Sequence, residues 1–306
     1  MKHRIKFNEP TILSEYQNGN YKVTIYSDGT KVRQNELDNL TPEFPESFDL
    51  KITNKCNNNC AFCHERSTPD GIHGDLNLPF FDGIHSGTEI AIGGGNPLLH
   101  PQLSTFLSRM KLKGVICSMT VNETDLYKQE DVIQYHIKNK RIHGIGVSPN
   151  GHITSKLIKS CQSLGNNCVI HLINGIHNQS DFEMLQSNGL KILILGFKNW
   201  GNGQTYLLNN LDEITANQSW LDNNLKDLIK KFKVVSFDNL ALTQLDVKSL
   251  MTESQRNEFY MGDDGGYTMY IDVVKSEFAL NSTSPTRYAI GDKNIIQMFE
   301  EINGKE

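Results

Sequence analysis

Several features that would place this chain in a membrane or on nucleic acid are missing from its 306 residues. It has no run of about 18 apolar residues, the length that a transmembrane helix requires. The N-terminal segment MKHRIKFNEPTILSEYQNGN starts with basic residues but lacks the apolar core of a secretory signal. Basic residues are not in excess either, because 30 Lys and Arg stand against 35 Asp and Glu, for a net charge of -5. We therefore expect a cytoplasmic protein with no membrane partner, and the charge argues against a nucleic-acid partner.

Cysteine is scarce and unevenly distributed. The chain has 6 cysteines, none of them after Cys168, and three of them lie in the short stretch CNNNCAFC. Because cytoplasmic thiols stay reduced, such a group indicates a metal centre or catalysis rather than a disulfide. The others, Cys117, Cys161 and Cys168, stand alone in apolar patterns, where free cysteine usually packs as a small hydrophobic residue.

Long internal repeats and low-complexity linkers are also absent, and what recurs is a short apolar run followed by an amphipathic segment. This alternation is typical of βα units on a parallel sheet. It predicts an α/β fold with six such units, arranged as a parallel or open barrel whose chemistry lies at the C-terminal ends of the strands. The predicted strands are residues 48–53, 89–94, 115–121, 142–148, 168–173 and 191–197.

Extensions are predicted on both sides of these units. Residues 1–45 are expected to form an N-terminal β-hairpin, because apolar and polar residues alternate over 21–25 and Asp28-Gly29 supplies a tight turn. Residues 236–306 are expected to form a C-terminal extension that covers the barrel, with a hairpin over 267–284.

Two local patterns refine this outline. Ser180 and Glu183 have the spacing of a capping box and predict the start of a helix. Residues 234–244 form a further apolar run, which is expected to close the sheet.

The three clustered thiols, Cys56, Cys60 and Cys63, allow three interpretations. A zinc site would need a fourth ligand such as His64 or His73, but structural zinc usually takes two ligand pairs and no second pair is evident. Residues 60–63 with His64 also match the CxxCH pattern of haem attachment, which belongs to exported proteins. The third interpretation is a 4Fe-4S cluster held by three cysteines, which leaves one iron open for another ligand.

The stretch CNNNCAFC resembles the CxxxCxxC signature of the radical S-adenosylmethionine (SAM) superfamily. Phe62 stands where that family often has an aromatic residue before the third cysteine, and the family places this loop directly after its first barrel strand. A second segment, Gly94-Gly95-Asn96, is similar to the family's GGEP-type motif, whose backbone binds the amino group of the methionine part of SAM. Asn96 replaces the commoner acidic residue.

Two weaker similarities follow further along the chain. Ser148 ends the fourth predicted strand, where the family often has a polar residue near the ribose or carboxylate of SAM. The segment ILILGFKNWGNG resembles the family's adenine-side segment.

The resemblance implies a partial (β/α)6 TIM-like barrel over residues 46–235, with Cys56, Cys60 and Cys63 as ligands of a 4Fe-4S cluster. Phe62, Gly94, Gly95, Asn96 and Ser148 are the implied SAM-binding residues. In the superfamily the reduced cluster cleaves SAM, and the resulting 5'-deoxyadenosyl radical abstracts hydrogen from a substrate. An electron donor such as flavodoxin or ferredoxin is also implied.

The substrate and any further catalytic residue are less well defined. Cys117 lies on the third predicted strand, and if it faced the barrel interior it would be a candidate hydrogen donor. Terminal hairpins suit recognition of a peptide or protein by strand addition, which makes a peptide the first expectation for the substrate. A small-molecule or nucleotide-derived substrate, and a non-catalytic scaffold that binds zinc or a cluster, are the alternatives.

Overall fold

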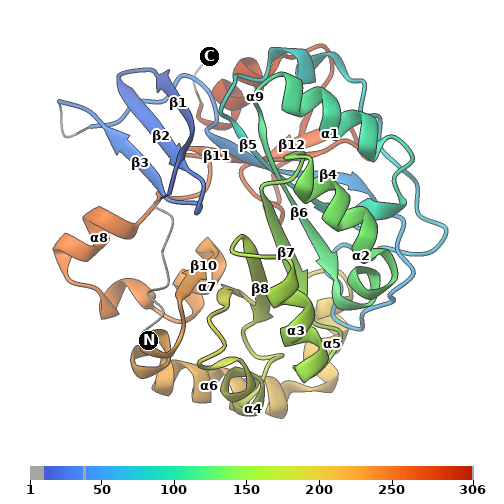
Figure 1. The fold of residues 1–306 in the computed structure, drawn as a ribbon, viewed down its shortest axis with the longest axis vertical. Coiled ribbons are helices and arrows are strands. Elements are labelled where there is room, and N and C mark those ends of the chain that lie inside the picture. The colour runs from blue at the N-terminus through green and yellow to red at the C-terminus, as the bar shows by residue number, and fades with distance from the viewer. Residues whose placement is uncertain (1–9, 37–38, 305–306) are drawn as a thin grey trace, which may run out of the picture.

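A ten-stranded, mostly parallel sheet forms the centre of the computed structural model, which describes residues 10–36 and 39–304 (Figure 1). Its strand order is β10-β9-β8-β7-β6-β5-β4-β11-β12-β13, and neighbours from β10 to β11 pair in parallel. The mixed α/β architecture predicted from the sequence is therefore confirmed. The strands are β4 (Ser47–Thr53), β5 (Glu89–Gly94), β6 (Ile116–Asn122), β7 (Gly144–Ser148), β8 (Cys168–Ile173), β9 (Lys191–Leu195), β10 (Val234–Phe237), β11 (Thr268–Asp272), β12 (Glu277–Ala279) and β13 (Tyr288–Ala289).

Helices connect the parallel strands and cover one face of the sheet, here named the outer face (Figure 1). None of the helices in the described part of the chain has the length and apolar character needed to cross a membrane. The α-helices are α1 (Leu103–Leu112), α2 (Glu123–Lys138), α3 (Ser155–Ser163), α4 (Gln179–Leu185), α5 (Asn202–Asn209), α6 (Leu211–Leu228), α7 (Asn239–Gln244), α8 (Glu253–Phe259) and α9 (Ile295–Ile302). Short 3-10 helices are η1 (Pro79–Gly83), η2 (Pro97–Leu99), η3 (Ile229–Lys231) and η4 (Val247–Leu250).

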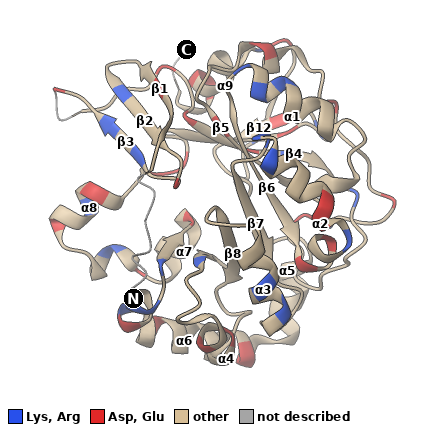
Figure 2. Ribbon diagram, viewed as in Figure 1, with Lys and Arg blue, Asp and Glu red and all other residues tan. Residues whose placement is uncertain are grey.

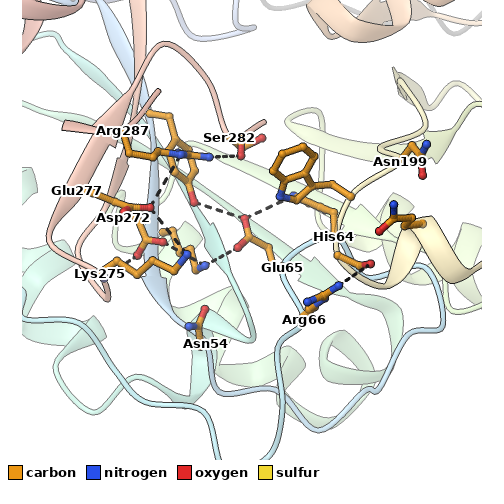
Figure 3. A pocket seen from close by; sticks show the side chains of 15 residues that line it. Asn54, His64, Glu65, Arg66, Asn199, Asp272, Lys275, Glu277, Ser282 and Arg287 are labelled. Carbon is orange, nitrogen blue, oxygen red and sulfur yellow. Dashed lines mark hydrogen bonds and ion pairs between the residues drawn. The ribbon is translucent and has the colours of Figure 1, made fainter. Parts of the chain in front are cut away.

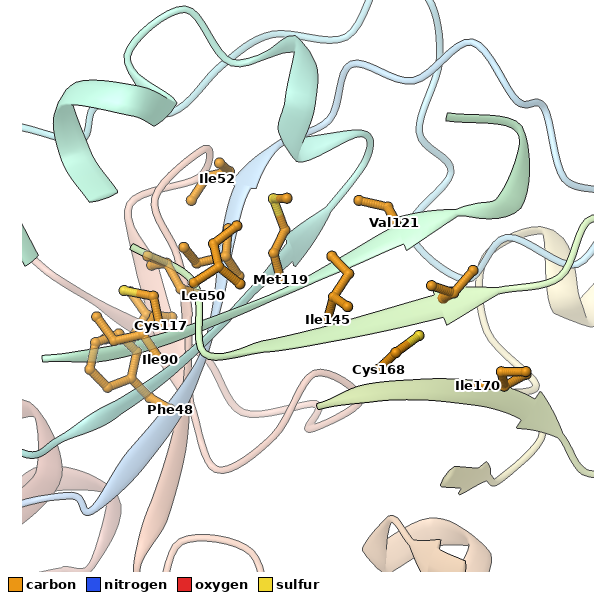
Figure 4. Close-up of a cluster of buried hydrophobic side chains, with 14 of the residues drawn as sticks. Phe48, Leu50, Ile52, Ile90, Cys117, Met119, Val121, Ile145, Cys168 and Ile170 are labelled. Atoms are coloured by element: carbon orange, nitrogen blue, oxygen red, sulfur yellow. The ribbon is translucent and has the colours of Figure 1, made fainter. Parts of the chain in front are cut away.

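Alternate residues of each strand pack on the outer face in one continuous hydrophobic cluster (Figure 4). In β4 these are Phe48, Leu50 and Ile52, each no more than 1% exposed. Cys117 of β6 belongs to the same cluster, together with Phe106 of α1. Burial of these side chains against the helices supplies the main stabilising term of the fold.

The opposite, inner face of the sheet is more accessible, with polar residues on several strands and apolar ones such as Leu193 and Leu195 on β9. Asp49 of β4 is exposed, and Ser118, Thr120 and His171 of β6 and β8 are half-buried. Burial lowers the pKa of His171 to about 4, so its imidazole is neutral at pH 7. The strands thus separate a buried apolar side, covered by helices, from a more accessible side of mixed polarity.

Strands far apart in the sheet are bridged at their N-terminal ends. Lys191 of β9 donates from Nζ to the carbonyl of Asp28 at 2.8 Å, and Lys31 forms an ion pair with Glu89 of β5 at 2.5 Å. The turn over residues 28–31 thus connects two strands that lie four places apart in the sheet.

That turn belongs to a separate three-stranded antiparallel sheet of β1 (Ile12–Asn18), β2 (Tyr21–Tyr26) and β3 (Lys31–Gln34). Basic residues on β3 are coloured in Figure 2, and one of them, Arg33, binds the fully buried carboxylate of Glu46. Nε of Arg33 lies 2.7 Å from Oε1 and Nη2 lies 2.9 Å from Oε2, while the hydroxyl of Tyr21 donates to Oε1 at 2.6 Å. This network ties the small sheet to the start of β4.

The structure agrees with the predicted flanks in part. The alternating segment over 21–25 and the turn after it form β2 and the connection to β3, and β1 adds a strand that was not predicted. The hairpin expected over 267–284 is present as β11 and β12, and it is built into the large sheet through β4. Parts of the predicted extensions, residues 1–9, 37–38 and 305–306, lie outside the described residues.

Two local predictions are wrong. The capping box that starts α4 is formed by Asn178 and Asp181, not by Ser180 and Glu183. Residues 234–244 do not close the sheet, because they form β10, an edge strand paired with β9, followed by α7.

Candidate functional site

The three clustered cysteines occupy the loop that follows β4. Cys56, Cys60 and Cys63 are free and half-buried, whereas the chain's other cysteines are buried. The backbone N–H of Cys63 donates to the carbonyl of Cys60 at 3.1 Å, so the loop turns back on itself between these two thiols. The three clustered thiols are therefore the more accessible ones, as expected for ligands of a metal centre.

The asparagines between the first two thiols shape this loop. Asn59 has a φ of 48°, in the left-handed region that asparagine tolerates better than most residues. The side chain of Asn58 donates a hydrogen bond to Asp125, which is 5% exposed near the start of α2. The loop is thereby fixed to the helix that follows β6.

The thiols influence one another electrostatically. Burial, together with the nearby Cys63 and Cys56, raises the pKa of Cys60 to about 11. The pKa of Cys56 is also raised, mainly by burial and in addition by Asp125 and Cys63. The three sulfurs therefore share one neighbourhood in which thiolates lack a compensating cation, and a bound cationic centre would favour the thiolate forms.

The GGGNP turn at the end of β5 lies against the start of the cysteine loop. The backbone N–H of Gly95 donates to the carbonyl of Thr53, and that of Asn96 donates to the carbonyl of Lys55, both at 2.7 Å. A Cβ atom on Gly95 would lie 2.4 Å from the Lys55 carbonyl oxygen, so only glycine allows this approach. The side chain of Asn96 accepts from the N–H of Leu98 at 3.0 Å and caps η2.

The loop after β9 meets the cysteine loop from the other side. The backbone N–H of Asn202 donates to the carbonyl of Cys63 at 3.0 Å, and Nη2 of Arg66 donates to the carbonyl of Gly201 at 3.3 Å. The ring of Phe62 packs edge-on against Tyr206 of α5, with ring centroids 5.7 Å apart. Both segments that resemble SAM-binding motifs thus contact the loop that carries the thiols.

The remaining predicted residues differ in their placement. Ser148 is half-buried at the C-terminal end of β7, beside Asn122 of β6. Cys117, by contrast, is 1% exposed on the outer face, where burial raises its pKa to about 12. It does not face the interior of the sheet, so the geometry expected of a hydrogen donor is absent.

The histidines considered as zinc ligands are engaged elsewhere. His64 lies 3.4 Å from both Oε1 of Glu65 and Nζ of Lys198, and Nδ1 of His73 is 2.9 Å from the hydroxyl of Thr53. Within residues 10–36 and 39–304, no three His, Cys, Asp or Glu side chains converge on a position for a single metal ion.

A charged cavity of about 560 Å³ lies next to the cysteine loop (Figure 3). Lys51, which is 3% exposed, is ion-paired there with Glu65 of the cysteine loop and with Asp272 of β11, the latter at 3.1 Å. This arrangement links the residue two positions after Cys63 to the C-terminal hairpin. Sequence reasoning missed it, although a lysine amid the apolar residues of β4 was an available signal.

Comparisons with known proteins give a match in fold. No family model matches the sequence, and no curated protein matches it. The chain is similar to the crystal structure of Streptococcus suis SuiB bound to S-adenosylmethionine, with a TM-score of 0.63, 12% identity and coverage of 95% of this chain and 88% of SuiB. SuiB bound to the precursor peptide SuiA matches with a TM-score of 0.56 and 14% identity, over 86% of this chain and 67% of that one. At these identities the likeness establishes a shared fold.

Proposed function

We propose that this chain is a radical SAM enzyme in which Cys56, Cys60 and Cys63 hold a 4Fe-4S cluster. The observation that carries the proposal is the position of the three accessible thiols, on the loop after β4 and directly against the GGGNP turn. SuiB, which shares the fold, was crystallised with S-adenosylmethionine.

The donor set suits a cluster better than a single ion. A zinc ion needs its ligands to converge on one point, and the described side chains provide no such group. In a cluster each thiolate binds its own iron, so the thiols need only surround the group from one loop. When bound, the cluster would supply one electron to SAM, which would split into methionine and a 5'-deoxyadenosyl radical. That radical would abstract hydrogen from the substrate.

The protein residues would bind and orient SAM. The backbone N–H groups of Gly95 and Asn96 are engaged by the cysteine loop, which leaves backbone carbonyls of the turn to accept from the amino group of SAM. Phe62, held by Tyr206, would contact the adenine side, and Ser148 would bind a polar group of the cofactor. Asn96 would act through its backbone, because its side chain caps η2.

The same proposal extends to architecture and location. Residues 46–235 would be the partial (β/α)6 barrel, flanked by the extensions over 1–45 and 236–306, and the parallel strands β4 to β9 lie within these bounds. An electron donor such as flavodoxin or ferredoxin would reduce the cluster. A cytoplasmic location agrees with the free state of all the cysteines in the described residues.

We assign the substrate class as a peptide or protein. The support is the likeness in fold to SuiB, which was crystallised with the precursor peptide SuiA. It agrees with the separate N-terminal sheet, whose edge strands β1 and β3 suit recognition of an extended segment.

The test is anaerobic reconstitution of the purified chain with iron and sulfide, followed by reduction and addition of SAM. The proposal predicts a brown protein that forms 5'-deoxyadenosine. A colourless protein that retains zinc and forms no 5'-deoxyadenosine would overturn it.

A further inference from the structure

The charged cavity beside the cysteine loop has features of a binding site in its own right. It is bounded by the C-terminal hairpin, by the cysteine loop and by the loop after β9 (Figure 3). None of the three thiols, Phe62 or the GGGNP turn lines it. The cavity is therefore separate from the thiols, Phe62 and the turn, and it shares Asn199, Trp200 and Gly201 with the segment that resembles the family's adenine-side segment.

Its positive groups are not all balanced by the protein. The ammonium group of Lys51 is ion-paired with two carboxylates, those of Glu65 and Asp272. Arg287 and Lys275, however, share the single carboxylate of Glu277, each at the long distance of 3.9 Å. Neither cation on this wall of the cavity thus has a carboxylate within hydrogen-bonding distance.

The guanidinium of Arg287 is fixed by its neighbours but is not fully hydrogen-bonded. Its Nη2 donates to the carbonyl of Ser282 at 2.6 Å, and its Cζ lies 5.0 Å from the centre of the Tyr270 ring. Its Nη1 is buried and has no hydrogen-bond partner among the described residues. The side chain as a whole is 23% exposed and lines the cavity. A fixed, partly exposed guanidinium is suited to a carboxylate, because its planar donor arrangement favours that group over a neutral amide.

The opposite side of the cavity offers an uncharged contact. Trp200, which is 52% exposed, lies there with Asn199. Arg66 adds a fourth cation at the side of the cysteine loop, where its Nη2 donates to the carbonyl of Gly201. A ligand with an anionic end and a short polar or apolar body would match both walls.

We propose that this cavity binds a carboxylate through Arg287 and Lys275, and that the carboxylate belongs to an acidic side chain of the peptide substrate. The peptide part rests on the proposed function, whereas the carboxylate part rests on the cavity alone. Recognition here would place an acidic residue of the substrate beside the cysteine loop and would select peptides by sequence.

The experiment measures binding by tryptophan fluorescence. The chain has two tryptophans, and Trp220→Phe leaves Trp200 as the only reporter, at the edge of the cavity. The probes are a blocked glycine-rich pentapeptide with a central glutamate, its glutamine counterpart and free glutarate. We expect saturable binding of the acidic peptide, at least about ten-fold tighter than of the glutamine peptide and weakened by added salt.

Variants assign the binding to the two cations. Arg287→Gln and Lys275→Gln should each weaken binding of the acidic peptide about ten-fold, and Lys275, 61% exposed in its side chain, can be replaced without disturbing the fold. Lys230→Gln, on a similarly exposed lysine of η3, should leave binding unchanged. Equal binding of the acidic and neutral peptides, or no binding of any probe, would overturn the proposal.

The comparison with free glutarate shows whether the bound carboxylate belongs to a peptide or to a small acid. Tighter binding of the acidic peptide than of glutarate supports the peptide assignment, and equal binding overturns that part in favour of a free small acid. Because no cluster or SAM is needed for the measurement, its failure is distinguishable from failure of the radical chemistry.

Discussion

The backbone N–H of Asn202 donates to the carbonyl of Cys63 at 3.0 Å, and this bond joins the loop after β9 to the loop after β4. Gly201, next to Asn202, has a φ of 57° and approaches His64 so closely that a Cβ would lie 2.3 Å from its carbonyl oxygen. Two segments far apart in the sequence are therefore packed together where the third thiol sits.

Gly201→Ala should separate these loops. The added methyl group would clash with backbone rather than with a flexible side chain, so the loops must move apart, at a cost of about 1–3 kcal/mol beyond the backbone strain. We expect less iron bound per chain after reconstitution and a lower thermal midpoint, measured by iron analysis and circular dichroism.

Gly189→Ala is the matched control. Gly189 also has a positive φ, 68°, but a Cβ there would meet no atom within 4 Å. This variant should show the cost of backbone strain alone, with iron binding unchanged. Equal iron binding in the two variants would contradict a role for the contact between the loops.

Glu46→Gln should destabilise the chain and change its response to acid. Burial alone would raise the pKa of Glu46, but the hydrogen bonds from Arg33 and the charges of Lys31 and Arg33 hold it below its usual value. Removing one partner from a buried ion pair costs about 3–5 kcal/mol, and we expect a loss of that order in the free energy of unfolding at neutral pH.

The sign of the pH effect follows from the lowered pKa. The stability contributed by Glu46 is fully present above its unfolded pKa of about 4.3 and is lost as the pH falls through the lower folded value. In urea unfolding at decreasing pH, the free energies of unfolding of the wild type and of Glu46→Gln should therefore converge. Glu15→Gln, which removes an exposed partner of Lys22, should change neither the free energy of unfolding nor its dependence on pH. A constant gap between wild type and Glu46→Gln down to acid pH would refute this account.

Cys117→Ala should affect stability and not chemistry. The thiol packs in the hydrophobic cluster with Phe48 and Ile90, so its truncation should cost about 1–2 kcal/mol in the free energy of unfolding. Formation of 5'-deoxyadenosine per bound cluster should stay at the wild-type level. Lost turnover in a variant of unchanged stability would restore Cys117 as a catalytic candidate.

Local patterns predicted the elements of the central sheet well. The predicted strands 89–94 and 168–173 coincide with β5 and β8, because each is a short apolar run with clear boundaries. The orientation of Cys117 was also readable, since Cys117, Met119 and Val121 alternate with polar residues of β6. The α4 cap was misplaced because Asn178 and Ser180 offer similar cap patterns two residues apart, and only Asn178 forms both cap hydrogen bonds.

Contacts between distant segments were the part that the sequence did not reveal. The ion pairs of Lys51 with Glu65 and Asp272 exist because β11 pairs in parallel with β4. No local pattern specifies that pairing, because the two strands are separated by most of the chain. The thiols of the candidate site were predictable because they share one loop, whereas the cavity beside them is assembled from three separate segments.

The most direct test of the central claim compares Cys60→Ala with Cys161→Ala, a core thiol of α3 that is fully buried. Both variants are reconstituted anaerobically, reduced and examined by EPR spectroscopy, and 5'-deoxyadenosine is then measured after addition of SAM. We predict that Cys161→Ala keeps the reduced-cluster signal and the product, and that Cys60→Ala loses both. A Cys60→Ala variant that retains the signal and forms 5'-deoxyadenosine would contradict the assignment of the cysteine loop.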